Sequence, residues 1–287
     1  MNEILFNVQR YLDDINFGRA ECDPKLIEEF GERSKELLSK KLNEKRKDKF
    51  TLRMSNVGRP LCQLQAEKQG MERQSPDNFF PMKMMFGDMI ETLAIVIMKA
   101  AGVEIQNEQI LVSNVAGIEG TFDVEIDGKI WDIKSAADWS FNHKFKNSTI
   151  QDLWNDDSFG YVGQLMSYAK SVNKPAGGWI VINKQTGEWT VLEAKYDEQF
   201  EKEVLDRVAE NTRVLNSNEP FKRCYSDYPE LFYKRETGNR VLGIPCTMCS
   251  FKFSCWPNLQ IYPSLSSTAK NKPLVHYTVV QEKDNTE

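Results

Sequence analysis

The segment spanning residues 117–136, GIEGTFDVEIDGKIWDIKSA, constrains the fold of this chain more than any other stretch. It contains two β-rich runs separated by Asp127-Gly128, a dipeptide typical of a two-residue hairpin turn because both of its residues tolerate positive φ. With these two residues as the loop, Ile126 pairs with Lys129. We therefore expect an antiparallel hairpin in that register.

The alternation of side chains along a strand sorts this hairpin into two faces, one mainly apolar and one mainly charged. We expect the core face to carry Phe122, Val124, Ile126, Trp131 and Ile133. We expect the opposite face to carry Asp123, Glu125, Ile130, Asp132 and Lys134.

The same register places Asp123 directly opposite Asp132, with Cβ atoms ~5 Å apart. Two carboxylates at that distance repel each other, so we expect a cation between them, either Lys134 or a divalent metal. Two carboxylates and the backbone carbonyl of Ile133 are suitable ligands for Mg²⁺. Such a metal activates water and stabilises a phosphoryl oxygen, with Lys134 assisting the water. The alternative is a hairpin whose charged face simply meets solvent.

The order of the remaining elements predicts an α/β fold with a single mixed sheet and helices packed on it. The expected helices cover residues 4–15, 24–49, 82–101, 148–154, 158–172 and 196–215. The expected strands cover residues 105–112, 120–126, 129–135, 178–183, 188–193 and 274–280.

Composition excludes several classes of protein. With 287 residues, 40% hydrophobic and 28% charged, the chain is long enough for roughly two domains or one elaborated domain with a real core. A net charge of −5 argues against a purely electrostatic DNA coat, and two histidines argue against a three-histidine zinc enzyme. With no apolar run of ~18 residues and no secretion-signal pattern, we expect a cytoplasmic protein without membrane contact.

Three motifs in a fixed order resemble the PD-(D/E)xK nuclease superfamily. Asp123 followed by Asp132-Ile133-Lys134 resembles the Asp…(Asp/Glu)-x-Lys signature. Upstream, Gly87 to Glu91 is similar to the Gly-x-x-x-Glu helix of the exonuclease branch. Downstream, Gln164 and Tyr168 match the Gln-x-x-x-Tyr motif of RecB-like and lambda-exonuclease-like nucleases, and their i, i+4 spacing puts both on one helix face.

The resemblance implies a restriction-endonuclease-like core at residues 76–220, preceded by a helical region at 1–75 and followed by a cysteine-rich segment at 221–287. In that family the catalytic set corresponds to Glu91, Asp123, Asp132, Lys134, Gln164 and Tyr168. The ligands of Mg²⁺ or Mn²⁺ correspond to Glu91, Asp123, Asp132 and the carbonyl of Ile133.

Six cysteines are present, and three of them, Cys246, Cys249 and Cys255, fall within ten residues. Such crowding in a reducing compartment indicates a metal or cluster site rather than disulfides. A closed site takes four thiolates in most cases, so a fourth ligand must come from elsewhere in the chain.

The late cysteines and Cys62 resemble those of iron–sulfur RecB-family nucleases, including AddB and CRISPR-associated RecB-like exonucleases. The resemblance implies a four-iron, four-sulfur cluster that joins the N- and C-terminal segments. Cys224 is the rival for the fourth ligand, while zinc or unlinked cysteines are the alternatives to a cluster. Cluster-bearing members usually carry histidine where Glu91 stands, and glutamate is closer to the lambda-exonuclease type.

The resemblance implies a metal-dependent DNA exonuclease in recombination, repair or phage DNA processing, in a bacterium or a phage-infected host. No Gly-x-x-x-x-Gly-Lys-(Ser/Thr) motif is present, so unwinding requires a partner such as a helicase, or the exonuclease mechanism itself. A single-strand annealing protein is a further expected partner. The alternatives are a CRISPR adaptation-type end-trimming nuclease, an endonuclease and a catalytically silent DNA-binding module.

Overall fold

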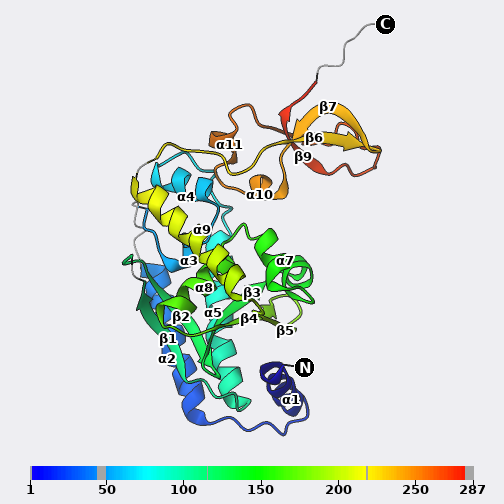
Figure 1. Ribbon diagram of the computed structural model, residues 1–287. Coiled ribbons are helices and arrows are strands. Elements are labelled where there is room, and N and C mark those ends of the chain that lie inside the picture. The colour runs from blue at the N-terminus through cyan, green and yellow to red at the C-terminus, as the bar shows by residue number, and fades with distance from the viewer. Residues whose placement is uncertain (1, 44–49, 115, 218, 282–287) are drawn as a thin grey trace, which may run out of the picture. The chain divides into compact units, whose positions relative to one another are not determined.

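The computed structural model describes residues 2–43, 50–114, 116–217 and 219–281 (Figure 1). The chain forms two compact units, each assembled from separated segments. Unit 1 comprises Met1–Arg59 and Asn78–Arg213, and unit 2 comprises Pro60–Asp77 and Val214–Glu287. The predicted three-range division at residues 75 and 220 stays a prediction.

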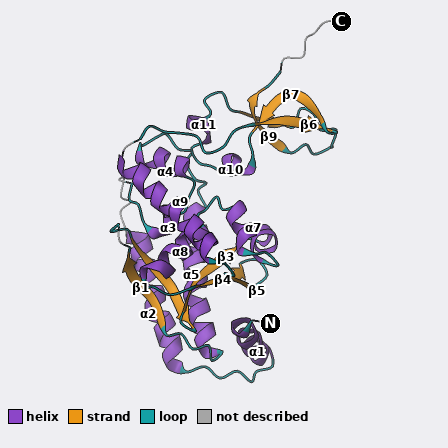
Figure 2. Cartoon of the chain, viewed as in Figure 1, coloured by secondary structure: helices purple, strands orange, loops and turns teal. Residues whose placement is uncertain are grey.

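A five-stranded mixed sheet in the order β1-β2-β3-β4-β5 forms the centre of unit 1 (Figure 2). The β3–β4 pair is parallel, and the other neighbouring pairs are antiparallel. The strands are β1 (Asn107–Ser113), β2 (Glu119–Ile126), β3 (Lys129–Ala136), β4 (Ala176–Asn183) and β5 (Trp189–Glu193).

The hairpin between β2 and β3 has the predicted register, with Ile126 paired to Lys129. Asp127 and Gly128 both have positive φ, at 52° and 68°. These angles suit a primed two-residue turn, which follows the right-handed twist of the flanking strands. Local turn chemistry therefore fixes how the two strands align.

Helices precede the sheet, connect its parallel strands and follow it. The crossover from β3 to β4 contains α6 (Asp138–Ser140), the π-helical turn η1 (Phe141–Phe145), α7 (Ile150–Asn155) and α8 (Tyr161–Ser171). The others associated with unit 1 are α1 (Glu3–Asn16), α2 (Pro24–Asn43), α3 (Met54–Val57), α5 (Phe80–Ala100) and α9 (Glu198–Ser217) as far as Arg213. The part of the second predicted helix over residues 44–49 lies outside the described residues.

Two apolar clusters bury both faces of the sheet. One packs Val124, Trp131 and Ile133 against α1 and α5, whereas the other packs Ile130 against α3, α7 and α8. Phe122 belongs to this second cluster, so the prediction that it shares the first cluster's face was wrong. The charged face of the hairpin is therefore covered by helices and does not simply meet solvent.

Unit 2 contains a second, four-stranded sheet in the order β6-β7-β9-β8, so the expectation of a single sheet was wrong. Its strands are β6 (Tyr228–Phe232), β7 (Arg235–Val241), β8 (Gln260–Pro263) and β9 (Leu274–Val279). Its helices are α4 (Leu61–Lys68), α10 (Ile244–Thr247) and α11 (Lys252–Cys255). Among the described residues, no helix is long and apolar enough to cross a membrane.

Candidate active site

The acidic pair on the hairpin is buried in unit 1. Asp123 on β2 is 8% exposed and Asp132 on β3 is 1% exposed. Oδ2 of Asp123 accepts a hydrogen bond from the backbone N–H of Ile133, at 2.6 Å. This cross-strand bond holds the Asp123 carboxylate beside β3, next to the residue that follows Asp132.

Lys134 provides a cation for this pair. Its Nζ lies 2.8 Å from Oδ1 and 2.7 Å from Oδ2 of Asp132, and only the Oδ1 contact has hydrogen-bond geometry. The two residues are separated by one position on β3, so their side chains leave the same face of the strand. The strand period predicted this pairing.

Helix α8 contributes Gln164 and Tyr168 to the same place. Nε2 of Gln164 donates to Oδ1 of Asp132 at 3.1 Å and to the Tyr168 hydroxyl at 3.3 Å. The side chain of Gln164 is buried, and its amide nitrogen hydrogen-bonds to the acidic pair and to the tyrosine. The i, i+4 spacing on one helix face makes both contacts possible.

Helix α5 contributes Glu91, whose Oε1 accepts a hydrogen bond from Nε2 of Gln109 at 2.9 Å. Burial raises the pKa of Glu91, Lys134 lowers it, and Asp132 raises it further. Since Lys134 and Asp132 both act on it, Glu91 lies within the electrostatic field of the hairpin site. The role of Glu91 as a catalytic and metal-binding residue, which the resemblance implies, stays a prediction.

The site contains more acidic groups than cations, and the pKa values of its aspartates and of its lysine are raised. Burial, Glu91 and Asp132 raise the pKa of Asp123 well above its usual range, and burial also raises the pKa of Asp132. Burial alone lowers the pKa of Lys134, but Asp132, Asp123 and Glu91 together raise it, so its ammonium stays protonated. The site thus holds three carboxylates against one ammonium.

The donor types fit a hard divalent cation, which prefers carboxylate and carbonyl oxygens. The electrostatics fit as well, because a cation would relieve the repulsion that raises the pKa values of these acids. Within the described ranges, however, no three His, Cys, Asp or Glu side chains surround a common point where one ion would sit. The site therefore matches a metal site in chemistry and charge but not in closed coordination geometry.

Two further aromatic residues adjoin this site and were not predicted from the sequence. The Nζ atom of Lys134 lies 5.7 Å from the centroid of the Tyr161 ring, and Phe159 stacks on Tyr161. Tyr161 precedes Gln164 by three positions and Tyr168 by seven, a spacing that places all three on one face of α8. That spacing was the available signal for Tyr161, whereas Phe159 lies before the helix.

The cysteines predicted as cluster ligands, Cys62, Cys246, Cys249 and Cys255, all belong to unit 2. Burial raises the pKa values of the three late thiols, that of Cys246 to about 11, and nearby thiolates including Cys62 raise them further. The thiols are therefore near neighbours. In the described part of the chain they nevertheless form no group of three around a shared metal position.

Cys224, the rival ligand, is in direct contact with Cys62. The backbone N–H of Cys62 donates to Sγ of Cys224 at 3.0 Å. A side-chain hydrogen bond between the two thiols raises the pKa of Cys62 and lowers that of Cys224. Unit 2 thus brings five cysteines together, one more than a four-thiolate site needs.

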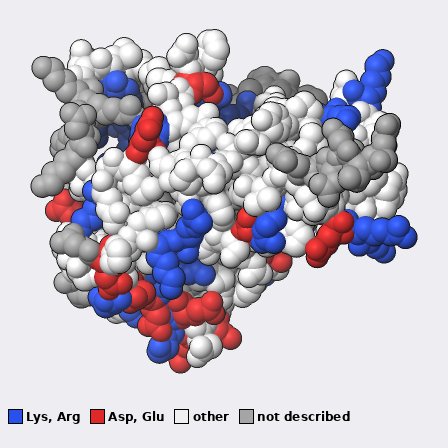
Figure 3. All heavy atoms as spheres, turned by 90° about the horizontal axis from the view of Figure 1, so that it is seen from above, with Lys and Arg blue, Asp and Glu red and all other residues white. Residues whose placement is uncertain are grey.

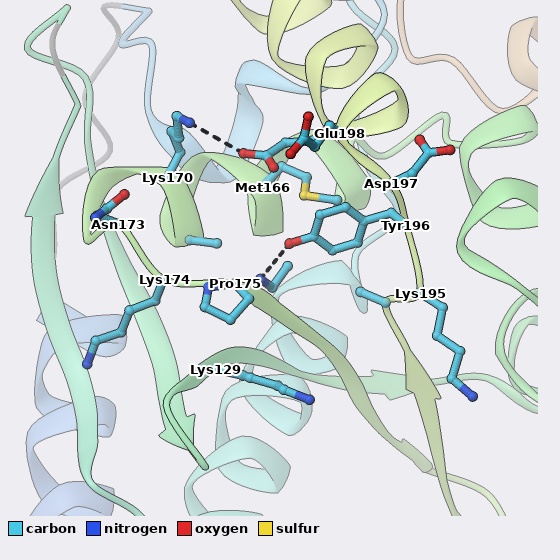
Figure 4. Close-up of a pocket in the computed structure, with 14 residues that line it drawn as sticks. Lys129, Met166, Lys170, Asn173, Lys174, Pro175, Lys195, Tyr196, Asp197 and Glu198 are labelled. Atoms are coloured by element: carbon cyan, nitrogen blue, oxygen red, sulfur yellow. Dashed lines mark hydrogen bonds and ion pairs between the residues drawn. The ribbon is translucent and has the colours of Figure 1, made fainter.

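A separate pocket of about 880 Å³ opens in unit 1 near the first residues of β4 (Figure 4). It is lined by both cationic and acidic side chains; Nζ of Lys170 lies 3.5 Å from Oε1 of Glu201, and the Tyr196 hydroxyl accepts from the N–H of Ala176. It shares no lining residue with the acidic site. In Figure 3, basic and acidic side chains are likewise interspersed over the face in view.

No protein-family model matches the sequence, and neither does any curated protein. Among solved structures, an alkaline exonuclease from Laribacter hongkongensis is similar with a TM-score of 0.39 and 14% identity, over 64% of this chain and 93% of that chain. The same enzyme in complex with dAMP is similar with a TM-score of 0.39 and 13% identity, over 58% and 88%. SSO0001 is similar with a TM-score of 0.37 and 16% identity, over 77% and 94%. At these TM-scores the similarities do not place the chain in a family.

Proposed function

We propose that this protein is a divalent-metal-dependent nuclease that hydrolyses phosphodiester bonds from the ends of DNA. The observation that carries the proposal is the buried pair of Asp123 and Asp132, with the ammonium of Lys134 held on Asp132 and the half-buried Glu91 within their electrostatic field. Buried acids that raise one another's pKa values are costly to keep and gather at sites where charge is used. Their order along the chain, with Gln164 and Tyr168 after them, supports a PD-(D/E)xK nuclease.

Asp123 and Asp132 would hold Mg²⁺ or Mn²⁺, with Glu91 and the carbonyl of Ile133 as further ligands. The bound ion would supply an activated water and charge stabilisation at the phosphoryl group. Lys134 already contacts Asp132 and would place its ammonium beside the attacking water and the transition-state phosphate.

The α8 residues would act on orientation rather than on proton transfer. Gln164 donates to Asp132 and to Tyr168, so it fixes the carboxylate and the phenol with respect to each other. Tyr168 would then position the DNA strand against the acidic group. A helicase or a single-strand annealing protein is the class of partner that such an end-processing activity implies.

We further propose that Cys62, Cys246, Cys249 and Cys255 bind a four-iron, four-sulfur cluster, with zinc as the alternative metal. The proximity of these thiols within unit 2 supports a soft-metal site. Such a site would join the segment around Cys62 to the chain more than 180 residues later, closing a long loop.

The test of the nuclease is digestion of end-labelled linear DNA in EDTA, Mg²⁺ and Mn²⁺, beside the same sequence as a covalently closed circle. We expect metal-dependent shortening of the linear DNA while the circle survives. Cleavage of the circle would instead indicate an endonuclease. No cleavage of either substrate by folded, metal-loaded protein would contradict a stand-alone nuclease.

A further inference from the structure

Two stacked aromatic rings lead from the acidic site toward the surface of unit 1. The ring centroids of Phe159 and Tyr161 lie 5.5 Å apart, with the ring planes 14° from parallel. Tyr161 is half-buried, whereas Phe159 is 51% exposed. The pair therefore has an inner ring next to Lys134 and an outer ring that meets solvent.

The backbone holds these rings in place. The carboxylate of Asp157 accepts hydrogen bonds from the N–H groups of Gly160, Tyr161 and Val162, each at 2.8 Å. Gly160, between the two rings, has φ of +80°, and a Cβ there would lie 2.4 Å from the backbone nitrogen of Arg59. The turn that carries the pair is thus fixed at several points, so the exposed ring is pre-positioned.

Each ring also has an ammonium near it. Nζ of Lys134 lies 5.7 Å from the Tyr161 centroid, and Nζ of Lys144 lies 5.9 Å from the Phe159 centroid. Lys144 is held by Asp156, at 2.9 Å from Oδ2 and 3.1 Å from the carbonyl oxygen. A nucleotide binds through its phosphate, which an ammonium attracts, and through its base, which stacks on an aromatic ring. Ammonium groups beside stacked rings can therefore contact both parts of a nucleotide.

We propose that Phe159 and Tyr161 form a base-stacking subsite for the nucleotide next to the scissile phosphate. This inference rests on the proposed function, because it uses the acidic group as the place of cleavage. Inside a duplex both faces of a base are covered by its neighbours, so the subsite takes a nucleotide that has left the stack, as in a single-stranded end. The substrate class is therefore a DNA strand whose terminal region is single-stranded at the moment of cleavage.

The test uses single-stranded oligonucleotides with one abasic residue at each successive position from the labelled end. In Mg²⁺, we expect Phe159→Ala to raise KM by roughly 5- to 150-fold, the range typical of losing one aromatic–base stack. Phe159→Trp keeps a ring and should stay near the wild type. Phe17→Ala is the matched control, since Phe17 is 70% exposed and carries the Arg19 guanidinium 4.7 Å from its ring centroid.

The position of the abasic residue makes the test specific to stacking. For the wild type, an abasic residue at one position only should raise KM by the same factor as Phe159→Ala does. For Phe159→Ala, an abasic residue at that position should leave KM unchanged. An equal response of wild type and Phe159→Ala at every position would overturn the subsite, as would a KM of Phe159→Ala equal to that of Phe17→Ala.

A binding measurement separates the subsite from the nuclease proposal. The probe is 2-aminopurine placed at the sensitive position of the oligonucleotide, with the protein in EDTA. If the wild type cleaves nothing, the probe is placed at each position in turn. The wild type should quench the fluorescence of the probe, and Phe159→Ala should not. Quenching without any cleavage in Mg²⁺ would support the stacking subsite and contradict the nuclease. Cleavage without a difference in quenching would support the nuclease and overturn the subsite.

Discussion

The ammonium of Lys134 lies 2.8 Å from Oδ1 and 2.7 Å from Oδ2 of Asp132, two positions earlier on β3. This contact offsets part of the negative charge that Asp132 shares with Asp123 and Glu91. In the proposed site the same carboxylate would also bind a divalent cation, so Lys134 and a bound cation would share the compensation of its charge. The free energy of unfolding should therefore depend on whether Asp132 has the Lys134 ammonium, a divalent metal ion or both beside it.

Replacing Lys134 with alanine should destabilise the metal-free protein, because it leaves buried carboxylates without their counter-charge. Losing one partner of a buried pair costs ~3–5 kcal/mol, and we expect roughly 2–3 kcal/mol here since Lys134 is partly exposed. The measurement is urea denaturation in EDTA and in Mg²⁺. Mg²⁺ should stabilise Lys134→Ala more than the wild type.

The control for this variant is Lys202→Ala, which removes an exposed partner of Asp206 and should change little in either condition. An equal effect of Mg²⁺ on Lys134→Ala and on the wild type would contradict a shared cation site at Asp132.

Asp123 should make the stability of the metal-free protein depend on pH. Folding raises the pKa of Asp123 through burial, Glu91 and Asp132. A carboxyl with a raised folded pKa contributes stability that is complete below its unfolded pKa of ~3.9 and is lost as pH rises through the folded value. We expect Asp123→Asn to remove this loss, because its amide does not titrate and its oxygen still accepts from Ile133.

The measurement is the free energy of unfolding in EDTA between pH 5 and pH 8. The curve of Asp123→Asn should be flatter than that of the wild type, while Asp206→Asn should follow the wild type. Parallel curves for wild type and Asp123→Asn would show that Asp123 keeps an ordinary pKa.

Two helical glycines, one closely packed in α8 and one with open space around it in α2, should respond in opposite ways to replacement by alanine. A Cβ at Gly163 would lie 2.7 Å from Cα of Gly58, so Gly163→Ala should cost ~1–3 kcal/mol by overpacking. Gly31 in α2 has nothing within 4 Å of such a Cβ, so Gly31→Ala should gain up to ~1 kcal/mol in helix propensity. Thermal unfolding of both variants measures the difference, and a stabilising Gly163→Ala would disprove the contact.

The cysteines should bind iron or zinc in protein purified without oxygen. Metal and sulfide analysis should find iron and sulfide, and Cys249→Ser and Cys62→Ser should lower both. Cys22→Ser is the control, since Cys22 belongs to unit 1. If Cys62→Ser keeps its full metal content and Cys224→Ser loses metal, then Cys224 and not Cys62 is the fourth ligand. Wild-type protein without bound metal would contradict the site.

Local rules predicted the hairpin well, because Asp127-Gly128 fixes the turn and the period of two fixes which residues share a face. Helical spacing likewise placed Gln164 and Tyr168 together. The contacts of Gln109 with Glu91 and of Asp157 with the start of α8 depend on tertiary packing or on an irregular turn, so no periodic pattern indicated them.

The missed strands have a different cause. The β7 sequence, RETGNRV, is largely polar, and β6 contains Pro229, so neither shows the apolar alternation that indicates a strand. Phe122 was assigned to the wrong core because strand parity alone does not show which helices cover each part of a twisted sheet.

The most direct test of the account compares Asp132→Asn with Asp206→Asn in cleavage of end-labelled linear DNA in Mg²⁺. Asp132 is buried beside Lys134 and Gln164, whereas Asp206 is an exposed partner of Lys202, so the two changes are chemically identical in different settings. We predict that Asp132→Asn lowers the cleavage rate by at least about 100-fold, the effect of weakening the hold on a catalytic metal by a few kcal/mol. Asp206→Asn should keep the wild-type rate. Equal rates for wild type and a folded Asp132→Asn would contradict the central claim that this acidic group is the site of hydrolysis.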